Sequence, residues 1–177
     1  EILSPDSDLH NLVESADLIL TNPPFGAKIG ITDDSLLRLY EFGYNWTYSE
    51  KDKTWYRLNT IVKNQAPQVL FLELCVRMLK PGGTMAIVLP EGIFGNKSLG
   101  YIWAYLKKHG KVLAMIDCPR NTFQPSTDTK TNVLIYQKGI EFPDEIIVSV
   151  AKNCGHDKRG RITNSVNEAL PNDFELI

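Results

Sequence analysis

The residues with the clearest chemical potential are Asn22, Pro23, Pro24 and Phe25, which directly follow a short apolar run at 17–21. Neither proline has an N–H, so the pair cannot donate to a sheet ladder, and their fixed φ angles make the turn stiff. The asparagine amide and the backbone carbonyls offer hydrogen-bond acceptors, and the phenylalanine ring offers a flat apolar face. Together these groups would form a rigid cup that fits an exocyclic amino group on a planar ring.

An amino group held in such a cup is suited to methyl transfer. The lone pair of adenine's amino nitrogen is delocalised into the ring, and acceptors for both of its hydrogens would return electron density to the nitrogen. Transfer from a sulfonium methyl then depends mainly on orientation and electrostatics, without a carboxylate base. Asn-Pro-Pro is also a plain turn signal, but its place directly after a buried strand favours the chemical interpretation.

The order of the elements indicates where this turn lies. Apolar runs predict strands over 17–21, 84–89, 112–117, 131–138 and 145–151, and periodicity predicts helices over 33–42, 65–80 and 98–109. Alternation of strands and helices predicts an α/β fold with a mostly parallel sheet. Because no helix separates the last strands, we expect them to pair antiparallel near the C-terminal edge. Ligands bind at the carboxyl ends of strands in such sheets, and the turn follows one of these ends.

Several polar residues have local roles in this scheme. Asp33 suits the N-terminus of the first helix, and Ser98 is expected to cap the last one. Glu73 and Arg77 are spaced as an i,i+4 ion pair, which we place on the solvent side of helix 65–80. Glu91 follows a core strand, where a helix N-terminal charge is the simpler interpretation.

Composition limits the classes of protein and partner. The 177 residues are 43% hydrophobic and carry a net charge of −2, so any contact with nucleic acid must come from local patches or a partner. The 3 cysteines are widely spaced, which argues against a zinc site and favours a reducing, cytoplasmic setting. No apolar run reaches membrane-spanning length.

Longer stretches carry a family resemblance. The Asn-Pro-Pro-Phe segment resembles the catalytic motif of adenine-specific DNA methyltransferases. Three other stretches are similar to one branch, the modification subunit of type I restriction-modification systems: FLELCVRMLKPGGTMAIVLPEGIFGN, NTFQPSTDTKTNVLIYQKG and GHDKRG. The likeness covers roughly 17–161. It implies transfer of a methyl group from S-adenosylmethionine to N6 of adenine, with DNA, a specificity subunit and a restriction subunit as partners.

The resemblance also implies individual roles. Asn22 and the Pro23 carbonyl would accept hydrogen bonds from the adenine amino group, and Phe25 would stack on a base flipped out of the duplex. Asn22 and Pro24 would also contact the cofactor. Phe123 matches the position of an apolar residue that faces the flipped base, and its alternative role is to anchor its loop in the core.

The glycine-rich cofactor loop of the family is missing. No G-x-G occurs among the 12 glycines, and such loops let the backbone approach the cofactor closely. We therefore expect residues 1–177 to be the C-terminal half of a Rossmann-like methyltransferase domain, with a core over 15–140 and a strand and tail over 141–177. The cofactor half is expected upstream of residue 1, and this chain alone is expected to be inactive.

Two segments and two rival functions remain open. The aromatic-rich segment 40–56 could touch DNA or a partner, or form a satellite core. The basic segment 152–161 could contact phosphate, although a solvated hairpin is the simpler interpretation.

A protein glutamine methyltransferase uses a similar cup, but that branch usually has Tyr at the position of Phe25 and lacks GHDKRG. A non-catalytic assembly module would not need an intact Asn-Pro-Pro-Phe.

Overall fold

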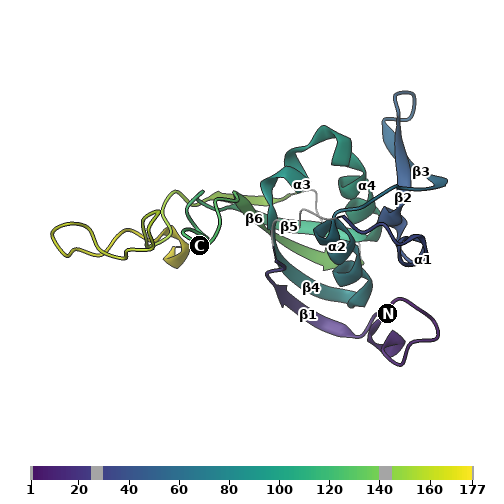
Figure 1. The fold of residues 1–177 in the computed structure, drawn as a ribbon, viewed down its shortest axis with the longest axis horizontal. Coiled ribbons are helices and arrows are strands. Elements are labelled where there is room, and N and C mark those ends of the chain that lie inside the picture. The colour runs from purple at the N-terminus through teal and green to yellow at the C-terminus, as the bar shows by residue number, and fades with distance from the viewer. Residues whose placement is uncertain (1, 25–29, 140–144, 177) are drawn as a thin grey trace.

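The computed structural model describes residues 2–24, 30–139 and 145–176. In these residues a five-stranded sheet has the order β1-β4-β6-β5-β7 (Figure 1). Its strands are β1 (Ala16–Thr21), β4 (Leu79–Pro90), β5 (Gly110–Asp117), β6 (Thr131–Lys138) and β7 (Ile147–Val150). β1 pairs parallel with β4, and β5 pairs parallel with β7, while β6 runs antiparallel to both β4 and β5. The predicted α/β class with a mostly parallel sheet is confirmed.

The place of the antiparallel strand corrects one detail of the prediction. β6 lies in the middle of the sheet, between β4 and β5, and β7 at the edge is parallel to its neighbour. The side chains explain this order, because Leu134 and Tyr136 of β6 are fully buried whereas Ile147 and Val148 of β7 are exposed. An apolar strand gains most from a central position, and a short exposed strand suits an edge.

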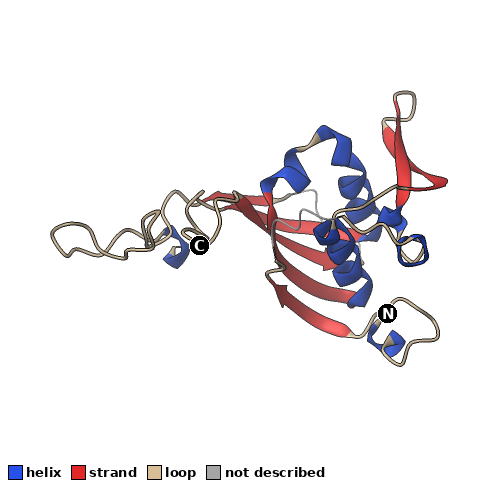
Figure 2. Ribbon diagram, in the orientation of Figure 1, coloured by secondary structure: helices blue, strands red, loops and turns tan. Residues whose placement is uncertain are grey.

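Helices cover one face of the sheet (Figure 2). The two long ones are α2 (Pro67–Met78) and α4 (Gly100–His109), with α3 (Glu91–Gly95) before α4 and α1 (Asp34–Leu37) before the hairpin. Short 3₁₀ turns span His10–Leu12, Glu41–Gly43, Lys97–Leu99 and Asp173–Glu175. Met85, Ile87 and Leu89 of β4 are fully buried in the core on this face.

The opposite face of the sheet is not covered by the described residues. Leu18 and Leu20 of β1 are 58% and 70% exposed, and they pair with Thr84 and Ala86, which alternate with the buried residues of β4. Ile147 of β7 is 71% exposed. Sheets with mostly parallel strands usually bury both faces, so these apolar residues mark a face suited to further packing.

The aromatic-rich segment forms an antiparallel hairpin of β2 (Tyr44–Ser49) and β3 (Thr54–Ile61) that packs on α4. The Trp46 ring stacks on Tyr101 with centroids 5.6 Å apart, and Trp55 meets the same tyrosine edge-on. These contacts support the satellite-core interpretation for the inner aromatics. Tyr48 and Tyr56 remain exposed.

The prediction that Glu73 faces solvent is wrong. Its carboxylate is fully buried, where it accepts hydrogen bonds from Glu41 N at 2.8 Å and Phe42 N at 2.7 Å and lies 3.5 Å from Arg77 Nη1. The 3₁₀ turn before the hairpin packs over this side of α2, so a residue that reads as solvent-facing is covered by a distant segment. Burial raises the pKa of Glu73 to about 7, against the opposing effect of the two amides and Arg77.

The predicted helix caps have mixed outcomes. Asp33 lies at the N-terminus of α1 as expected, and its side chain caps the helix by accepting a hydrogen bond from Leu36 N at 2.9 Å. Ser98 does not cap α4. It lies in the preceding 3₁₀ turn, where Asn96 provides the cap by accepting from Ser98 N at 3.0 Å. Glu91 is the first residue of α3, which agrees with its interpretation as a helix N-terminal charge.

Candidate active site at the carboxyl edge of the sheet

The carboxyl ends of the parallel strands meet at one edge of the sheet. Here the chain leaves β1 at Thr21, β4 at Pro90 and β5 at Asp117, and it enters β6 at Thr131. Backbone hydrogen bonds join these ends, from Glu91 N to Lys130 O at 2.9 Å and from Cys118 N to Thr131 O at 3.1 Å. Whatever binds at this edge therefore meets residues from several strands at once.

The Asn-Pro-Pro turn begins directly at the end of β1. Asn22 and Pro24 are exposed and Pro23 is buried. Thr21 is the last residue of the strand and pairs with Ile87 in the centre of the sheet, which fixes the position of the turn. No described residue makes a hydrogen bond with the Asn22 side chain or with the Pro23 carbonyl. Phe25 lies outside the described residues.

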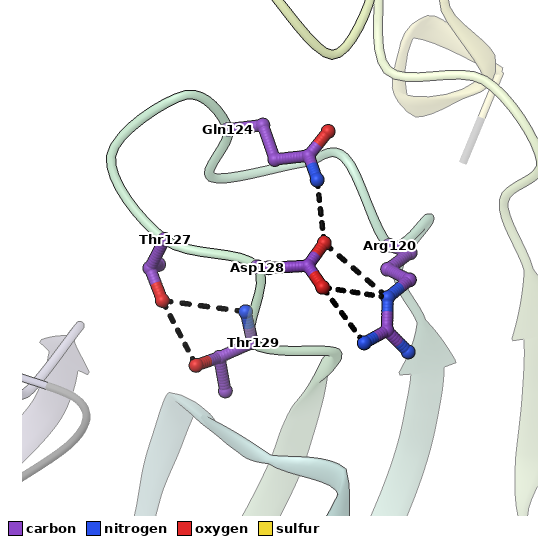
Figure 3. Close-up of polar contacts among 5 residues, drawn as sticks. All are labelled: Arg120, Gln124, Thr127, Asp128 and Thr129. Carbon is purple, nitrogen blue, oxygen red and sulfur yellow. Dashed lines mark hydrogen bonds and ion pairs between the residues drawn. The ribbon is translucent and has the colours of Figure 1, made fainter.

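The loop between β5 and β6, residues 118–130, is held together by its own polar contacts (Figure 3). Arg120 and Asp128 form a two-pronged ion pair at 2.8–3.3 Å, and Gln124 donates to the same carboxylate. The hydrogen bond from Arg120 holds the pKa of Asp128 below its usual value. Thr127 and Thr129 join their hydroxyls at 2.9 Å. Figure 3 shows these side chains closing one loop above the strand ends.

Phe123 lies in this loop and is half-buried. Its carbonyl accepts a hydrogen bond from Thr127 N at 3.0 Å. The loop joins β6, which lies two strands from β1, so its base is about 10 Å from the Asn-Pro-Pro turn at the usual strand spacing. The loop that carries Phe123 and the turn that carries Asn22 therefore leave the same edge of the sheet.

The segment 151–176 extends from this edge and packs against the loop. Asn121 Nδ2 donates to His156 O at 2.7 Å, and His156 Nε2 lies 3.2 Å from Thr122 O. The structure thus brings together two stretches, 121–139 and 155–160, that are separate in the sequence and that both carry the family resemblance. A hydrogen bond from Ala151 N to Asp117 O, 3.0 Å long, anchors the start of the segment to the end of β5.

Three further polar residues of this edge, Lys130, Asp117 and Asn132, carry little signal in the sequence. Lys130 Nζ and Asp117 Oδ1 form an ion pair at 2.7 Å, and Asn132 Nδ2 lies 3.5 Å from the same carboxylate oxygen. Asp117 lies at the end of an apolar strand and Lys130 lies just before the next one. These positions predict a contact only if β5 pairs with β6, and the sequence pattern does not show that pairing.

A cavity of about 320 Å³ lies at the opposite edge of the sheet. Its lining includes Glu14, Glu73, Arg77, His109 and Lys138, which precede parallel strands or end the antiparallel one. Most of these groups have internal partners; Lys138, for example, binds the carboxylate of Glu14 at 2.9 Å and the carbonyl of Leu79 at 2.7 Å. Because the cavity lies at the opposite edge of the sheet, it is separate from the Asn-Pro-Pro turn.

Two classes of feature are not found in the described residues. Residues 2–24, 30–139 and 145–176 contain no group of three or more His, Cys, Asp and Glu side chains that could hold a metal ion. In the same ranges, no helix has the length and apolar character needed to cross a membrane.

Solved structures define the class of fold. A class I S-adenosylmethionine-dependent methyltransferase described as putative, from Listeria monocytogenes, is 22% identical with a TM-score of 0.60, covering 78% of this chain and 38% of that one. A type I restriction-modification methyltransferase subunit from Streptococcus thermophilus is 24% identical with a TM-score of 0.52, covering 79% and 27%. The fold is that of Rossmann-like S-adenosylmethionine-dependent methyltransferases.

The chain belongs to the N-6 DNA methylase family, whose sequence model matches residues 4–170. A curated relative, the type I restriction enzyme EcoEI methylase subunit of Escherichia coli, is 28% identical over 127 residues, or 71% of this chain. The chain spans 22% of the length of that relative. The resemblance drawn from the sequence is confirmed.

Proposed function

We propose that the protein transfers a methyl group from S-adenosylmethionine to N6 of adenine in DNA, as the modification subunit of a type I restriction-modification system. The observation that carries this proposal is the Asn-Pro-Pro turn, which places two acceptors without partners among the described residues at the carboxyl edge of the sheet. Membership of the N-6 DNA methylase family supports the choice of substrate.

The acceptors suit the chemistry of an aromatic amino group. The Asn22 side-chain oxygen and the Pro23 carbonyl each accept one amino hydrogen, which orients the nitrogen and raises its electron density. Rigid acceptors stabilise the charge that develops on the nitrogen without having to reorganise. When bound, S-adenosylmethionine supplies the electrophilic methyl group. The exposed Asn22 and Pro24 would lie against this cofactor.

Aromatic residues hold the base. Adenine inside a duplex cannot reach the turn, so the base must flip out of the stack. Phe25 stacks on the flipped ring, and Phe123 approaches it from the loop between β5 and β6. The half-buried state of Phe123 and the internal contacts of its loop support a role as a preset wall of the base pocket.

The chain would supply only part of the methyltransferase domain. The uncovered face with Leu18, Leu20 and Ile147 fits packing against the cofactor half, which we place upstream of residue 1. The same half would contribute the glycine loop. Specificity and restriction subunits would be the protein partners, which agrees with a net charge of only −2 on this chain.

The proposal is tested with the intact protein and its partner subunits. Incubation with radiolabelled S-adenosylmethionine and DNA is expected to give N6-methyladenine, identified by mass spectrometry of the digested DNA. Label found on glutamine of a protein, with none on DNA, would favour the glutamine methyltransferase alternative. The absence of label from both would favour an assembly module.

The half-domain arrangement has its own test. Circular dichroism first checks that residues 1–177 fold on their own. The folded chain is then titrated calorimetrically with S-adenosylmethionine. Without the glycine loop, we expect no binding tighter than about 10 μM, or roughly −7 kcal/mol. Tighter binding would show that this chain contains a complete cofactor site.

A further inference from the structure

A tight turn at 157–161 projects from the segment that packs on the Phe123 loop. Gly160 N donates to Asp157 O and Asp157 N donates to Arg161 O, both at 2.9 Å. Gly160 has a φ of +78°, a conformation that glycine adopts without strain. Lys158 and Arg159 are the central residues of this turn, with Asp first and Gly last as such turns prefer. Both residues are exposed.

The charge of the turn is not balanced. Asp157 accepts hydrogen bonds from Arg159 N at 2.8 Å and Arg161 N at 3.0 Å, and the Arg161 guanidinium lies 2.7 Å from its carboxylate. The backbone hydrogen bond from Arg161 contributes most to lowering the pKa of Asp157, to about 2. Asp157 is thus ionised and paired with Arg161. Lys158 and Arg159 are exposed, and no described acid pairs with either side chain.

The turn is joined to the candidate active site. His156, the residue before the turn, binds the loop through Asn121 and Thr122. At the other end, a side-chain carbon added to Gly160 would lie 3.3 Å from Pro125 Cδ, so the turn is close against the loop. Both ends of the basic turn therefore touch the loop that carries Phe123, at the same edge of the sheet as Asn22.

We propose that Lys158 and Arg159 bind the phosphates of the DNA strand that flank the flipped adenine. This inference rests on the proposed function. Phosphate contacts position a protein on the duplex, and flexible exposed cations are sufficient to make them. Because the net charge of the chain is −2, any phosphate contact that it makes must come from a local positive site, and these two residues lie beside the loop that carries Phe123.

The test measures the salt dependence of DNA binding by the intact protein with its partner subunits. For Lys158→Ala/Arg159→Ala, loss of two phosphate contacts should reduce the slope of log K against log salt concentration by about 1.8. The KM for DNA should rise while kcat stays close to that of the unchanged protein. The turn should survive, because Asp157 binds the backbone N–H of Arg159.

A matched control removes the same charge elsewhere. Lys107 and Lys108 are exposed in the last turn of α4, which precedes β5 and so lies at the opposite edge of the sheet. Lys107→Ala/Lys108→Ala should leave the salt slope unchanged. An equal fall in slope for both double variants would overturn the proposal, since it would reflect total charge and not a local contact.

Two further results would contradict it. If Lys158→Ala/Arg159→Ala binds and methylates DNA with an unchanged slope, the turn makes no phosphate contact. If the same variant loses a partner subunit in size-exclusion chromatography while its salt slope is unchanged, the turn binds an acidic protein surface instead. Failure of the proposed function is distinguished separately, because the unchanged protein would then give no N6-methyladenine.

Discussion

Two sets of polar groups, one at each edge of the sheet, differ in their pairing. At the amino edge the buried Glu73 carboxylate accepts two backbone N–H groups and lies beside Arg77, and Lys138 binds both Glu14 and a backbone carbonyl. At the carboxyl edge Asn22, Lys158 and Arg159 are exposed, and their side chains have no partner among the described residues. A buried polar group without a partner costs free energy, whereas an exposed group is hydrated and can exchange water for a ligand.

This difference separates stability from function. Where a polar group is paired within the chain, its loss leaves partners unsatisfied and weakens the fold. Where it is exposed and unpaired, its loss should leave the fold intact and affect binding or chemistry. Substitutions in the paired set should therefore lower the free energy of unfolding, whereas substitutions in the unpaired set should lower DNA binding or methylation.

Glu73→Ala should give the largest loss of stability. It leaves the part-buried N–H of Glu41 and the buried N–H of Phe42 without an acceptor, and the two unsatisfied donors cost about 3 kcal/mol together. The free energy of unfolding is measured by denaturant melts at pH 6, on the intact protein. Glu50→Ala is the control, since Glu50 forms only an exposed pair with Lys53. An equal effect of both substitutions would remove the distinction between the edges.

The sequence was informative where local chemistry decides the structure. Two prolines after an apolar run specify a turn at a strand end, and the structure has β1 end at Thr21. Asp33 could be placed at a helix N-terminus from its charge, and its capping contact with Leu36 N spans only three residues. The alternation of strands and helices was sufficient to predict the class of the fold.

The sequence was not informative where distant segments meet. Glu73 appears solvent-facing within its helix, and only the 3₁₀ turn at 41–43 makes it buried. The central place of β6 depends on competition among strands for burial, which no local pattern encodes. The contact between His156 and Thr122 joins residues 34 apart in the sequence. The packing of 155–160 against 121–139 is therefore visible only in the structure.

At the carboxyl edge, Asn22→Ala should reduce methylation without unfolding the protein. Removal of one preorganised acceptor at a reacting centre costs about a hundredfold or more in rate. Methyl incorporation into DNA by the intact assembly measures this effect, and Asn22→Asp should retain more activity because it keeps an acceptor oxygen. Near-normal methylation by Asn22→Ala would refute the role assigned to Asn22.

Phe25→Ala should weaken binding of the flipped base by about 1–3 kcal/mol, the range for a base stacked on an aromatic ring. Stability should change by less than about 1.5 kcal/mol, against roughly 3–5 for a buried phenylalanine. Fluorescence of 2-aminopurine at the target position measures flipping, and Phe25→Trp should retain more of it. A large loss of stability with normal flipping would make Phe25 a core residue.

The most gradual effect expected is a change of stability with pH that originates at the amino edge. The pKa of Glu73 is raised in the folded state to about 7, from a usual value of 4.5, so between these values the folded protein binds a proton that the unfolded chain does not. Its contribution to stability is thus complete below pH 4.5 and falls as pH rises toward 7, by at most about 1.4 kcal/mol per pH unit. Melts of the protein and of Glu73→Gln between pH 5 and 8 isolate this contribution, because the amide does not titrate. Parallel curves for the two proteins would mean that the amides of Glu41 and Phe42 keep the carboxylate ionised throughout. The amino edge would then be held by a permanent buried charge, in sharper contrast to the exposed and unpaired groups of the carboxyl edge.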